Sequence, residues 1–537
     1  MEKNDFENRL KNLSSMTKDE HVQLRNEIML NRPEMLEPWW FDVSCDFEVL
    51  MVADGIINYG LGEFGLSSFL TIFKQMEQES NTNLKLKVTL AHRENPGSVA
   101  MQESNPDFVR TIVDFKFDNP AHFDPEKYDQ IWLMGHTSNP ITKAELTVID
   151  DFMVKGGGVF ATGDHGNIGS GLSGNVTRVK DMRHWENFGN GEVSMIGDRR
   201  NDTNKPPEGN FSSYTVDDQK DELPQDIHTR LYGAYPNVYP HPVLSIKRSI
   251  KPSGIIDILP DHPHEGECKP ETTFHVKNPK TGLIHKIRTQ TIAISFVPSG
   301  NTGGYKSPTQ PHCFPAVHTF EGRIADVGRI VVDSTWHHFL NINLEGFDAQ
   351  TLQVVYQYPK NITKWIAKHR RRLCHYIRYT MYTMLSGRVL EASILDMNMK
   401  AEEIPTSDLY IIGMHMIDII SCEESPAEAL DFCITMLQSV APELAEKLDV
   451  WNQERDASED AIHNQFVNYQ PMVGTALGMG IARLKDKFGN PKRRLTEKDE
   501  AIIQEVFTKG MEDGLQRSME LFEKKLRSLG SMRKRAR

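Results

Sequence analysis

Short apolar runs separated by polar turns dominate the first two thirds of the chain. Continuous runs of this length are typical of strands buried on both faces of a sheet. Helical patterns lie between them, so the sequence predicts alternating strands and helices built around a mostly parallel sheet with helices on both faces. The predicted strands are Phe47–Asp54, Leu84–His92, Tyr128–His136 and the run "GVFATGDHG" that begins at Gly158.

Two helices are predicted between these strands. Leu66, Phe69, Leu70 and Phe73 recur at helical spacing and form one apolar face. In the second helix Thr142 is an expected N-cap, Glu145 completes a capping box, and the triple glycine from Gly156 ends the helix.

The pattern changes twice further along the chain. Residues 174–242 are rich in Asn, Asp, Gly and Pro and are interpreted as a long insertion. Strands return at Thr289–Pro298, Phe314–Phe320 and Gly328–His338, and helical periodicity takes over from Phe347. We therefore predict an N-terminal helical arm (1–40), an α/β domain (41–346) and an α-helical domain (347–537). The last helix carries an apolar stripe of Ile503, Phe507, Met511, Leu515, Met519, Phe522, Leu526 and Leu529.

Composition narrows the classes of function. The 537 residues include 61 Lys and Arg against 74 Asp and Glu, a net charge of −13 that disfavours nucleic acid and anionic membranes as partners. The basic stretches 368–378 and 531–537 are interpreted as solvated surface and tail. The start of the chain is too polar for a signal peptide, and no apolar run is long enough to span a membrane. Six cysteines without a CxxC pair suggest reduced thiols, so we expect a cytoplasmic protein.

Candidate chemistry gathers where the predicted strands end, because ligands of parallel α/β sheets bind outside the carboxyl ends of the strands. Asp54, His136 and Trp336 are candidate substrate-binding residues, with Asp54 alternatively a turn residue. His165 is the candidate general base or metal ligand, and the alternative is a histidine whose two nitrogens hydrogen-bond the surrounding loop. Asp164 either orients His165 or caps the following helix. The last strand runs into Asp333-Ser334-Thr335-Trp336-His337-His338, where one histidine of the pair is expected to face the site.

A second polar cluster offers a metal site. In "PDHPHEGE", His262 and His264 are suitable ligands for a divalent metal and Glu265 is a candidate catalytic carboxylate. The spacing H-x-H-E matches no strong zinc signature, and an exposed loop is the alternative. The glycine-rich stretch 166–175 lacks the Lys-Ser/Thr of a phosphate-binding P-loop, so a plain loop is favoured there.

The order of these motifs resembles the ThuA-like (trehalose utilisation) branch of the class I glutamine amidotransferase-like superfamily. The resemblance rests on "YDQIWLMGH", a helix, the triple glycine and "GGGVFATGDHG", and more loosely on "PHPVL" (His241, Pro242) and the segment from Phe314 to His338. It spans roughly residues 47–344 and implies a flavodoxin-like domain. Amidotransferases carry a nucleophilic cysteine in this turn, whereas ThuA-like proteins carry a histidine, which His165 resembles.

The chain departs from that family at two places. Asp164 precedes the histidine, and Trp336-His337-His338 replaces the closing Gly-His. With no cysteine in the turn, glutaminase activity is not expected. The resemblance implies a hydrolase-type enzyme acting on a small polar, carbohydrate-like substrate. The alternative is a catalytically inactive ligand-sensing or scaffold domain, whose helical C-terminal domain mediates homo-oligomerisation or partner binding.

Overall fold

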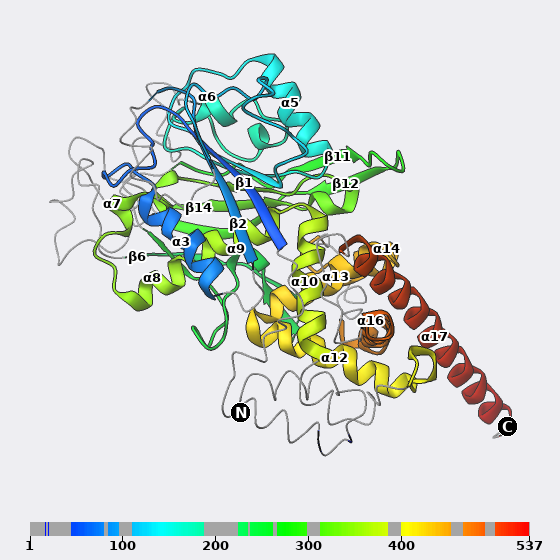
Figure 1. Cartoon of the computed structure of the whole chain (residues 1–537). Coiled ribbons are helices and arrows are strands. Elements are labelled where there is room, and N and C mark those ends of the chain that lie inside the picture. The colour runs from blue at the N-terminus through cyan, green and yellow to red at the C-terminus, as the bar shows by residue number, and fades with distance from the viewer. Residues whose placement is uncertain are drawn as a thin grey trace. The chain divides into compact units, whose positions relative to one another are not determined.

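The computed structural model describes residues 17, 20, 45–79, 84–95, 110–186, 224–234, 237–260, 266–297, 312–384, 399–452, 466–488 and 500–535 (Figure 1). The chain divides into two compact units. Residues 46–80 and 84–372 form the first, here called the α/β unit. Residues 1–45, 81–83 and 373–537 form the second, called the helical unit.

A nine-stranded mixed sheet forms the centre of the α/β unit, in the order β3-β2-β1-β4-β5-β15-β14-β13-β7. The pairs β1–β4, β4–β5, β5–β15 and β2–β3 are parallel. The pairs β15–β14, β14–β13 and β13–β7 are antiparallel. The strands are β1 (Cys45–Ala53), β2 (Leu84–His92), β3 (Arg110–Ile112), β4 (Gln130–Met134), β5 (Gly158–Thr162), β7 (His228–Thr229), β13 (Gln290–Val297), β14 (His312–Phe320) and β15 (Ile330–Asp333).

The prediction of a mostly parallel sheet is thus confirmed for β1, β4, β5 and β15 and for the pair β2–β3, whereas β13 and β14, for which no direction was predicted, run antiparallel to their neighbours. A parallel connection needs a crossover of a dozen or more residues. β14 ends at Phe320 and β15 begins at Ile330, with a short 3₁₀ turn, η5 (Gly322–Ala325), between them. This connection is too short for a crossover helix, so the chain reverses direction.

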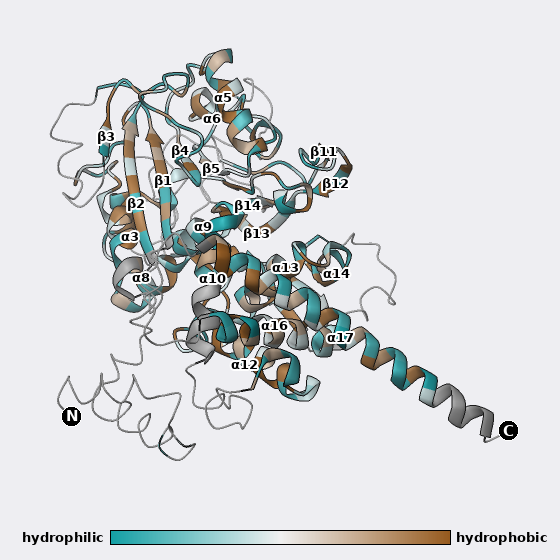
Figure 2. Ribbon diagram, turned by 45° about the vertical axis from the view of Figure 1, so that its right-hand side comes forward, coloured by the Kyte–Doolittle hydropathy of each residue, from teal (hydrophilic) through white to brown (hydrophobic). Residues whose placement is uncertain are grey.

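Helices cover both faces of the sheet, and the side chains alternate accordingly. Leu50, Ile131 and Val159 share a buried cluster with Ile149 and Phe152 of helix α5 (Lys143–Val154). On the opposite face, Trp132 packs between Phe160 and the rings of Phe69 and Phe73 from helix α3 (Ser67–Glu79). Figure 2 shows the apolar residues along β1 and β2.

The predicted start of α5 is confirmed. The Thr142 side chain accepts from the Glu145 amide, and the Glu145 carboxylate accepts from the Thr142 amide, which completes a capping box. Glu145 also pairs with Arg93 after β2 and accepts from the amide of Phe117 at 3.2 Å. The capping residue therefore joins three segments of the α/β unit.

The predicted insertion contains more strand structure than its composition suggests. Of residues 174–242, the structure describes 174–186, 224–234 and 237–242. They include η3 (Val179–Asp181), β6 (Pro224–Asp226), edge strand β7 and the pair β8 (Leu231–Ala234) and β9 (Asn237–Pro240). Three short elements follow: η4 (Pro242–Leu244), β10 (Ile258–Pro260), which pairs with β6, and the hairpin β11 (Thr273–Lys277) and β12 (Ile284–Arg288).

The described residues from 341 onward are mainly helical, as the periodicity predicts from Phe347, and the first helix already begins at Asn341. In the helical unit α17 packs on α16, and Ile503, Phe507, Met511 and Leu515 of its stripe are buried. The helices are α7 (Asn341–Leu344), α8 (Ala349–Val355), α9 (Gln357–Ile366), α10 (His369–Met384), α12 (Thr406–Glu423), α13 (Pro426–Gln438), α14 (Pro442–Leu448), α16 (Phe466–Phe488) and α17 (Glu500–Arg535), with the 3₁₀ turn η8 (Ala401–Glu403) before α12.

Two sequence-based expectations concern the environment of the protein. None of the helices in the described ranges is long and apolar enough to cross a membrane. Cys268, Cys313, Cys422 and Cys433 are free, whereas Cys374 is disulfide-bonded. The expectation that all cysteines are reduced is therefore wrong for Cys374, since cysteine spacing alone does not reveal which side chains the fold brings together.

Candidate functional site

Main-chain hydrogen bonds join the loops that follow β4, β5 and β15. The amide of Gly169 donates to His136 at 3.2 Å, that of Gly171 to Thr137 at 2.9 Å, and that of Trp336 to Gly163 at 2.8 Å. The carboxyl ends of these strands lie beside the end of β1, where the strand order reverses between β1 and β4. Such a reversal is where doubly wound sheets bind ligands.

Asp54 connects the end of β1 to the loop after β4. Its Oδ1 accepts from the amides of His136 at 2.5 Å and Thr137 at 3.0 Å, and its Oδ2 accepts from the Thr137 hydroxyl at 2.7 Å. The side chain is buried. These bonds give Asp54 the role of a turn residue. This is the alternative to substrate binding that the sequence left open.

His136 lies directly over Gly55. A Cβ at Gly55 would stand 2.4 Å from His136 Nδ1, and Gly55 has a φ of +60°, so glycine is required here on two grounds. His136 Nδ1 is buried and has no hydrogen-bond partner. The ring is partly exposed, which keeps His136 a candidate for contacting a substrate.

The turn after β5 is closed by backbone packing. A Cβ at Gly163 would lie 2.4 Å from the carbonyl oxygen of Ile168, and one at Gly169, where φ is +86°, would lie 2.7 Å from that of Gly135. The turn leads into α6 (Ser170–Ser173), whose N-cap is Gly169 without a side-chain hydrogen bond. Asp164 is therefore not the cap of this helix, which removes one of its two predicted roles.

The Asp164 carboxylate lies between two histidines. Its Oδ2 is 3.7 Å from His165 Nε2 and 3.6 Å from His337 Nε2, while its Oδ1 accepts from the Thr335 hydroxyl at 3.3 Å. His337 Nδ1 lies 2.7 Å from Asn343 Oδ1. Both of these histidine–carboxylate distances are longer than a hydrogen bond. The His165 side chain is 24% exposed and that of His337 only 1%.

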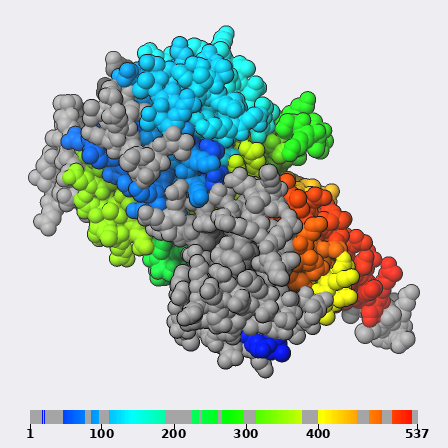
Figure 3. Space-filling model, viewed as in Figure 1, coloured from blue at the N-terminus to red at the C-terminus, as the bar shows by residue number. Residues whose placement is uncertain are grey.

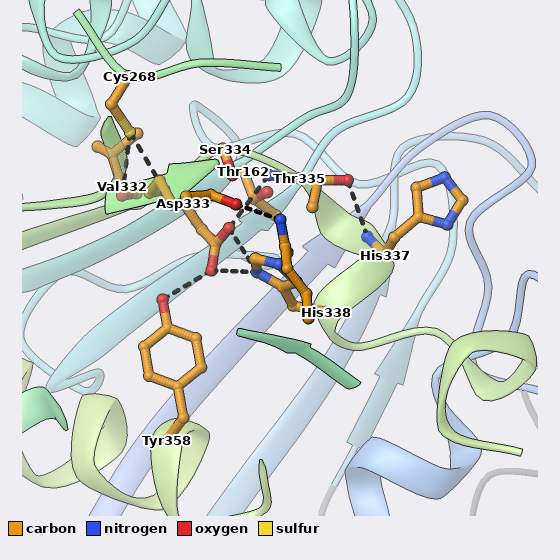
Figure 4. Close-up of polar contacts among 12 residues, drawn as sticks. Thr162, Cys268, Val332, Asp333, Ser334, Thr335, His337, His338 and Tyr358 are labelled. Carbon is orange, nitrogen blue, oxygen red and sulfur yellow. Dashed lines mark hydrogen bonds and ion pairs between the residues drawn. The ribbon is translucent and has the colours of Figure 1, made fainter. Parts of the chain in front are cut away.

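A second carboxylate–histidine pair lies one strand away, at Asp333 and His338. His338 Nδ1 lies 2.8 Å and 3.0 Å from the two Asp333 oxygens, and the Tyr358 hydroxyl donates to Oδ2 at 2.6 Å. Burial, followed by the Asp333 charge, raises the pKa of Tyr358 well above its usual range. Figure 4 shows His338 and Tyr358 converging on Asp333, whereas the His337 ring points away.

His337 and His338 belong to a 3₁₀ turn, η6 (Trp336–His338), and not to a strand. The strand has therefore already turned at these residues, which is the case in which alternation along a strand does not apply, and the two rings point to different neighbours. Both are buried, as is Trp336, whose ring stacks on His337 at 4.1 Å and meets Phe64 edge-on. Trp336 therefore acts as packing and does not offer an open surface to a substrate.

Arg183 joins the turn after β5 to the turn after β15, and it was not identified from the sequence. Its buried guanidinium donates to the carbonyl oxygens of Asp164, His184 and Ser334 and stacks on the Trp185 ring. Burial lowers the pKa of this group. Nothing in "DMRHWE" distinguishes Arg183 from a surface arginine, since its partners come from distant parts of the chain.

Cys268 lies behind Asp333. Its thiol is buried 3.5 Å from the carbonyl oxygen of Ala316 and 3.6 Å from that of Val332. Burial, and then the Asp333 charge, raise the pKa of Cys268 well above its usual value. A thiol held protonated in this way is a poor nucleophile, so its chemistry matches that of a packing residue.

The other predicted residues are not part of this arrangement. His262, His264 and Glu265 lie outside the described residues, so the predicted metal site is not placed. Among the residues that are described, no group of three or more His, Cys, Asp or Glu side chains is arranged to hold a metal ion. His241, which the family resemblance singles out, caps η4 through Nδ1 and packs its ring against Trp365.

Comparison with models of known protein families finds no match to this chain, and comparison with curated proteins finds none either.

Proposed function

We propose that the α/β unit is a hydrolase-type enzyme whose reactive group is His165. One observation carries the proposal: a buried carboxylate, Asp164, lies between the partly exposed His165 and the buried His337, at the carboxyl edge of the sheet. Sites of doubly wound enzymes lie at this edge. A neighbouring carboxylate favours one tautomer of a histidine, so the nearness of Asp164 supports the role of general base for His165.

Each group has a defined task in this proposal. Asp164 favours the proton on His165 Nε2, which leaves Nδ1 as the basic nitrogen of the neutral ring. His165 then accepts the proton of an attacking water and returns it to the leaving group. Thr335 and Asn343 fix the orientation of Asp164 and His337 through hydrogen bonds of 3.3 Å and 2.7 Å. His136, over Gly55, is the proposed contact for substrate.

The family assignment belongs to the same proposal. The strands β2-β1-β4-β5-β15 follow the 2-1-3-4-5 order of flavodoxin-like folds, which supports a ThuA-like, amidotransferase-like domain. The substrate class, a small polar carbohydrate-like molecule, rests on that resemblance alone. A cytoplasmic location stays a sequence-based prediction, and the disulfide at Cys374 counts against it. A divalent metal at His262 and His264 stays a sequence-based prediction, and none of the steps above uses it.

A scaffold or ligand-sensing role is the second candidate, and burial favours it. Asp54, Trp336, His337 and His338 are all buried, and hydrogen bonds or ring contacts within the unit engage each of them. Under this alternative the carboxylate–histidine contacts stabilise the loops and transfer no proton. The helical unit would then mediate assembly or partner binding.

A substrate panel separates the two candidates. Purified protein is assayed against p-nitrophenyl glycosides, p-nitrophenyl esters and sugar lactones, with heat-inactivated protein as the blank. The enzyme proposal predicts hydrolysis above the blank for at least one sugar derivative. Hydrolysis of esters alone would retain the hydrolase and remove the carbohydrate class. No hydrolysis of any compound would contradict the enzyme proposal and favour the scaffold.

A further inference from the structure

The guanidinium of Arg183 donates to main-chain carbonyl oxygens alone. Its Nη2 donates to Asp164 and, at 2.7 Å, to Ser334, and its Nε also donates to Ser334 at 3.1 Å. Its Nη1 donates to His184 at 2.8 Å. No carboxylate oxygen of the described residues lies within 4.0 Å of this guanidinium. Arg183 therefore bridges main-chain segments and is not part of a salt bridge.

Glycine at position 266 leaves the space for this guanidinium. A Cβ at Gly266 would collide with Arg183 Nη2 and stand 2.7 Å from the carbonyl oxygen of Ser334. Figure 3 shows residues 110–186 as a broad light-blue to cyan region of the surface, yet Arg183, within this segment, is 0% exposed. Burial of a charge is costly unless hydrogen bonds satisfy the group, and the four bonds of Arg183 do so.

The main chain and the ring beside Arg183 fix the direction of its side chain. Arg183 forms an antiparallel bridge with Cys268. Next to this bridge the Lys269 amide donates to the carbonyl oxygen of Met182 at 3.0 Å. The guanidinium carbon lies 4.5 Å from the centre of the Trp185 ring. Because both ends of the side chain are held, movement of the guanidinium is restricted.

Arg183 joins the two turns that carry the groups of the candidate site. Asp164 and His165 belong to the turn after β5, and His337 belongs to the turn that follows Ser334. Asp164 Oδ2 lies 3.7 Å from His165 Nε2 within its own turn and 3.6 Å from His337 Nε2 in the other. A shift of one turn against the other would change the second distance directly. Displacements of about 1 Å in an active site can slow a reaction by about 10²-fold.

We propose that Arg183 is a positioning residue, whose planar fork of donors holds Asp164 between His165 and His337. Its effect on catalysis rests on the proposed function of the α/β unit. Lysine would keep the positive charge but donates from a single nitrogen, so it cannot reproduce the fork. The proposal therefore distinguishes the geometry of the guanidinium from its charge.

Steady-state kinetics with the panel substrate that the wild type hydrolyses fastest test this role. Arg183→Lys should lower kcat by about 10–100-fold and leave KM within about twofold, because substrate binding does not use this contact. Gly266→Ala should lower kcat as well, since its Cβ displaces the guanidinium while the charge stays. Arg178→Met is the matched control: the Arg178 guanidinium lies over the Phe320 ring, 5.2 Å from its centre, and kcat should stay at the wild-type value.

Hydrogen exchange at residues 163–169 gives a readout that needs no substrate. Exchange there should be faster in Arg183→Lys than in Arg178→Met, with both proteins shown to be folded by their thermal midpoints; Gly266→Ala takes the place of Arg183→Lys if that variant does not fold. Wild-type kcat in Arg183→Lys, or an equal loss of kcat in the control, would overturn the inference and retain the proposed function. If the wild type hydrolyses no panel compound, the proposed function fails and exchange alone decides the inference: equal exchange in the two variants would overturn it.

Discussion

At the scale of single residues, Asp164 connects the groups of the candidate site. One buried carboxylate accepts from Thr335 and lies within 3.7 Å of two histidine rings. Its main-chain oxygen accepts from Arg183, so the same residue is also fixed to the turn after β15. Asp164 thus both holds the loops in position and brings a charged group beside the two histidines, and the family resemblance does not predict an aspartate here.

Local position in the sequence predicts part of this arrangement. Asp54, His136, Asp164 and His165 each follow a buried run, and a residue there must lie at the carboxyl edge of a parallel sheet. Arg183, Asn343 and Tyr358 could not be predicted. Tyr358 bonds to Asp333, 25 residues away, and Arg183 bonds to Ser334, 151 residues away. Asn343 contacts His337 because the chain turns at η6.

His318 provides a test at this scale that does not depend on function. It lies buried in β14 with Nε2 2.7 Å from the Thr291 hydroxyl, and burial lowers its pKa to about 4. The unfolded chain binds the proton near pH 6.5, so stability should fall as the pH drops from about 6.5 to 4. The free energy of unfolding should fall by about 3 kcal/mol across this pH range.

The measurement is the free energy of unfolding by denaturant at several pH values. His318→Gln, which can keep a hydrogen bond to Thr291, should flatten the slope across that window. His275→Gln changes an exposed histidine and should leave the slope as it is in the wild type. Equal slopes in the wild type and His318→Gln would show that His318 is not buried in the neutral form.

At the scale of elements, predictions succeed where the signal is local. The capping box of α5 depends on residues three apart and is confirmed, as is the helical stripe of α17. The direction of β13 and β14 depends on which strands pair across the sheet, and the apolar pattern of a strand is the same in either direction. That is why the sequence does not predict the direction of these two strands.

Among the contacts between elements, those of Glu145 give a direct test. Burial raises the pKa of Glu145, but hydrogen bonds from Arg93 and from the amides of Thr142 and Phe117 outweigh it, so its pKa lies below the usual value. Glu145→Gln should therefore lower the free energy of unfolding by about 1–3 kcal/mol at pH 7. The difference should begin to shrink as the pH falls below the ordinary glutamate pKa of about 4.3, where the unfolded chain takes up the proton first, and it should disappear as the pH falls through the lower pKa of the folded state.

Chemical denaturation of both proteins at pH 7 and at several pH values below 4 measures this effect. Glu126→Gln is the matched control, since Glu126 forms an exposed ion pair with Lys155 at 2.6 Å. Exposed pairs contribute at most about 1 kcal/mol. A cost for Glu145→Gln no larger than that of the control would contradict the role given to this residue in joining α5 to β2.

At the scale of the whole molecule, the hydrophobic pattern predicts a sheet-containing unit and a helical region. It does so because alternating strands and helices are followed by helices alone. The pattern carries no comparable signal for activity. Burial of His337, His338 and Trp336 arises from packing among distant segments, which hydrophobic periodicity does not encode. The functional claim therefore depends on His165, the partly exposed histidine beside Asp164.

The value of kcat/KM for His165→Ala, relative to the wild type, tests that claim most directly. It is measured with the panel substrate that the wild type hydrolyses fastest, and His275→Gln serves as the control. A general base predicts a decrease of about 10²–10⁴-fold for His165→Ala, with an unchanged thermal midpoint and a control at wild-type rate. A His165→Ala protein that is folded and hydrolyses the substrate at the wild-type rate would contradict the account.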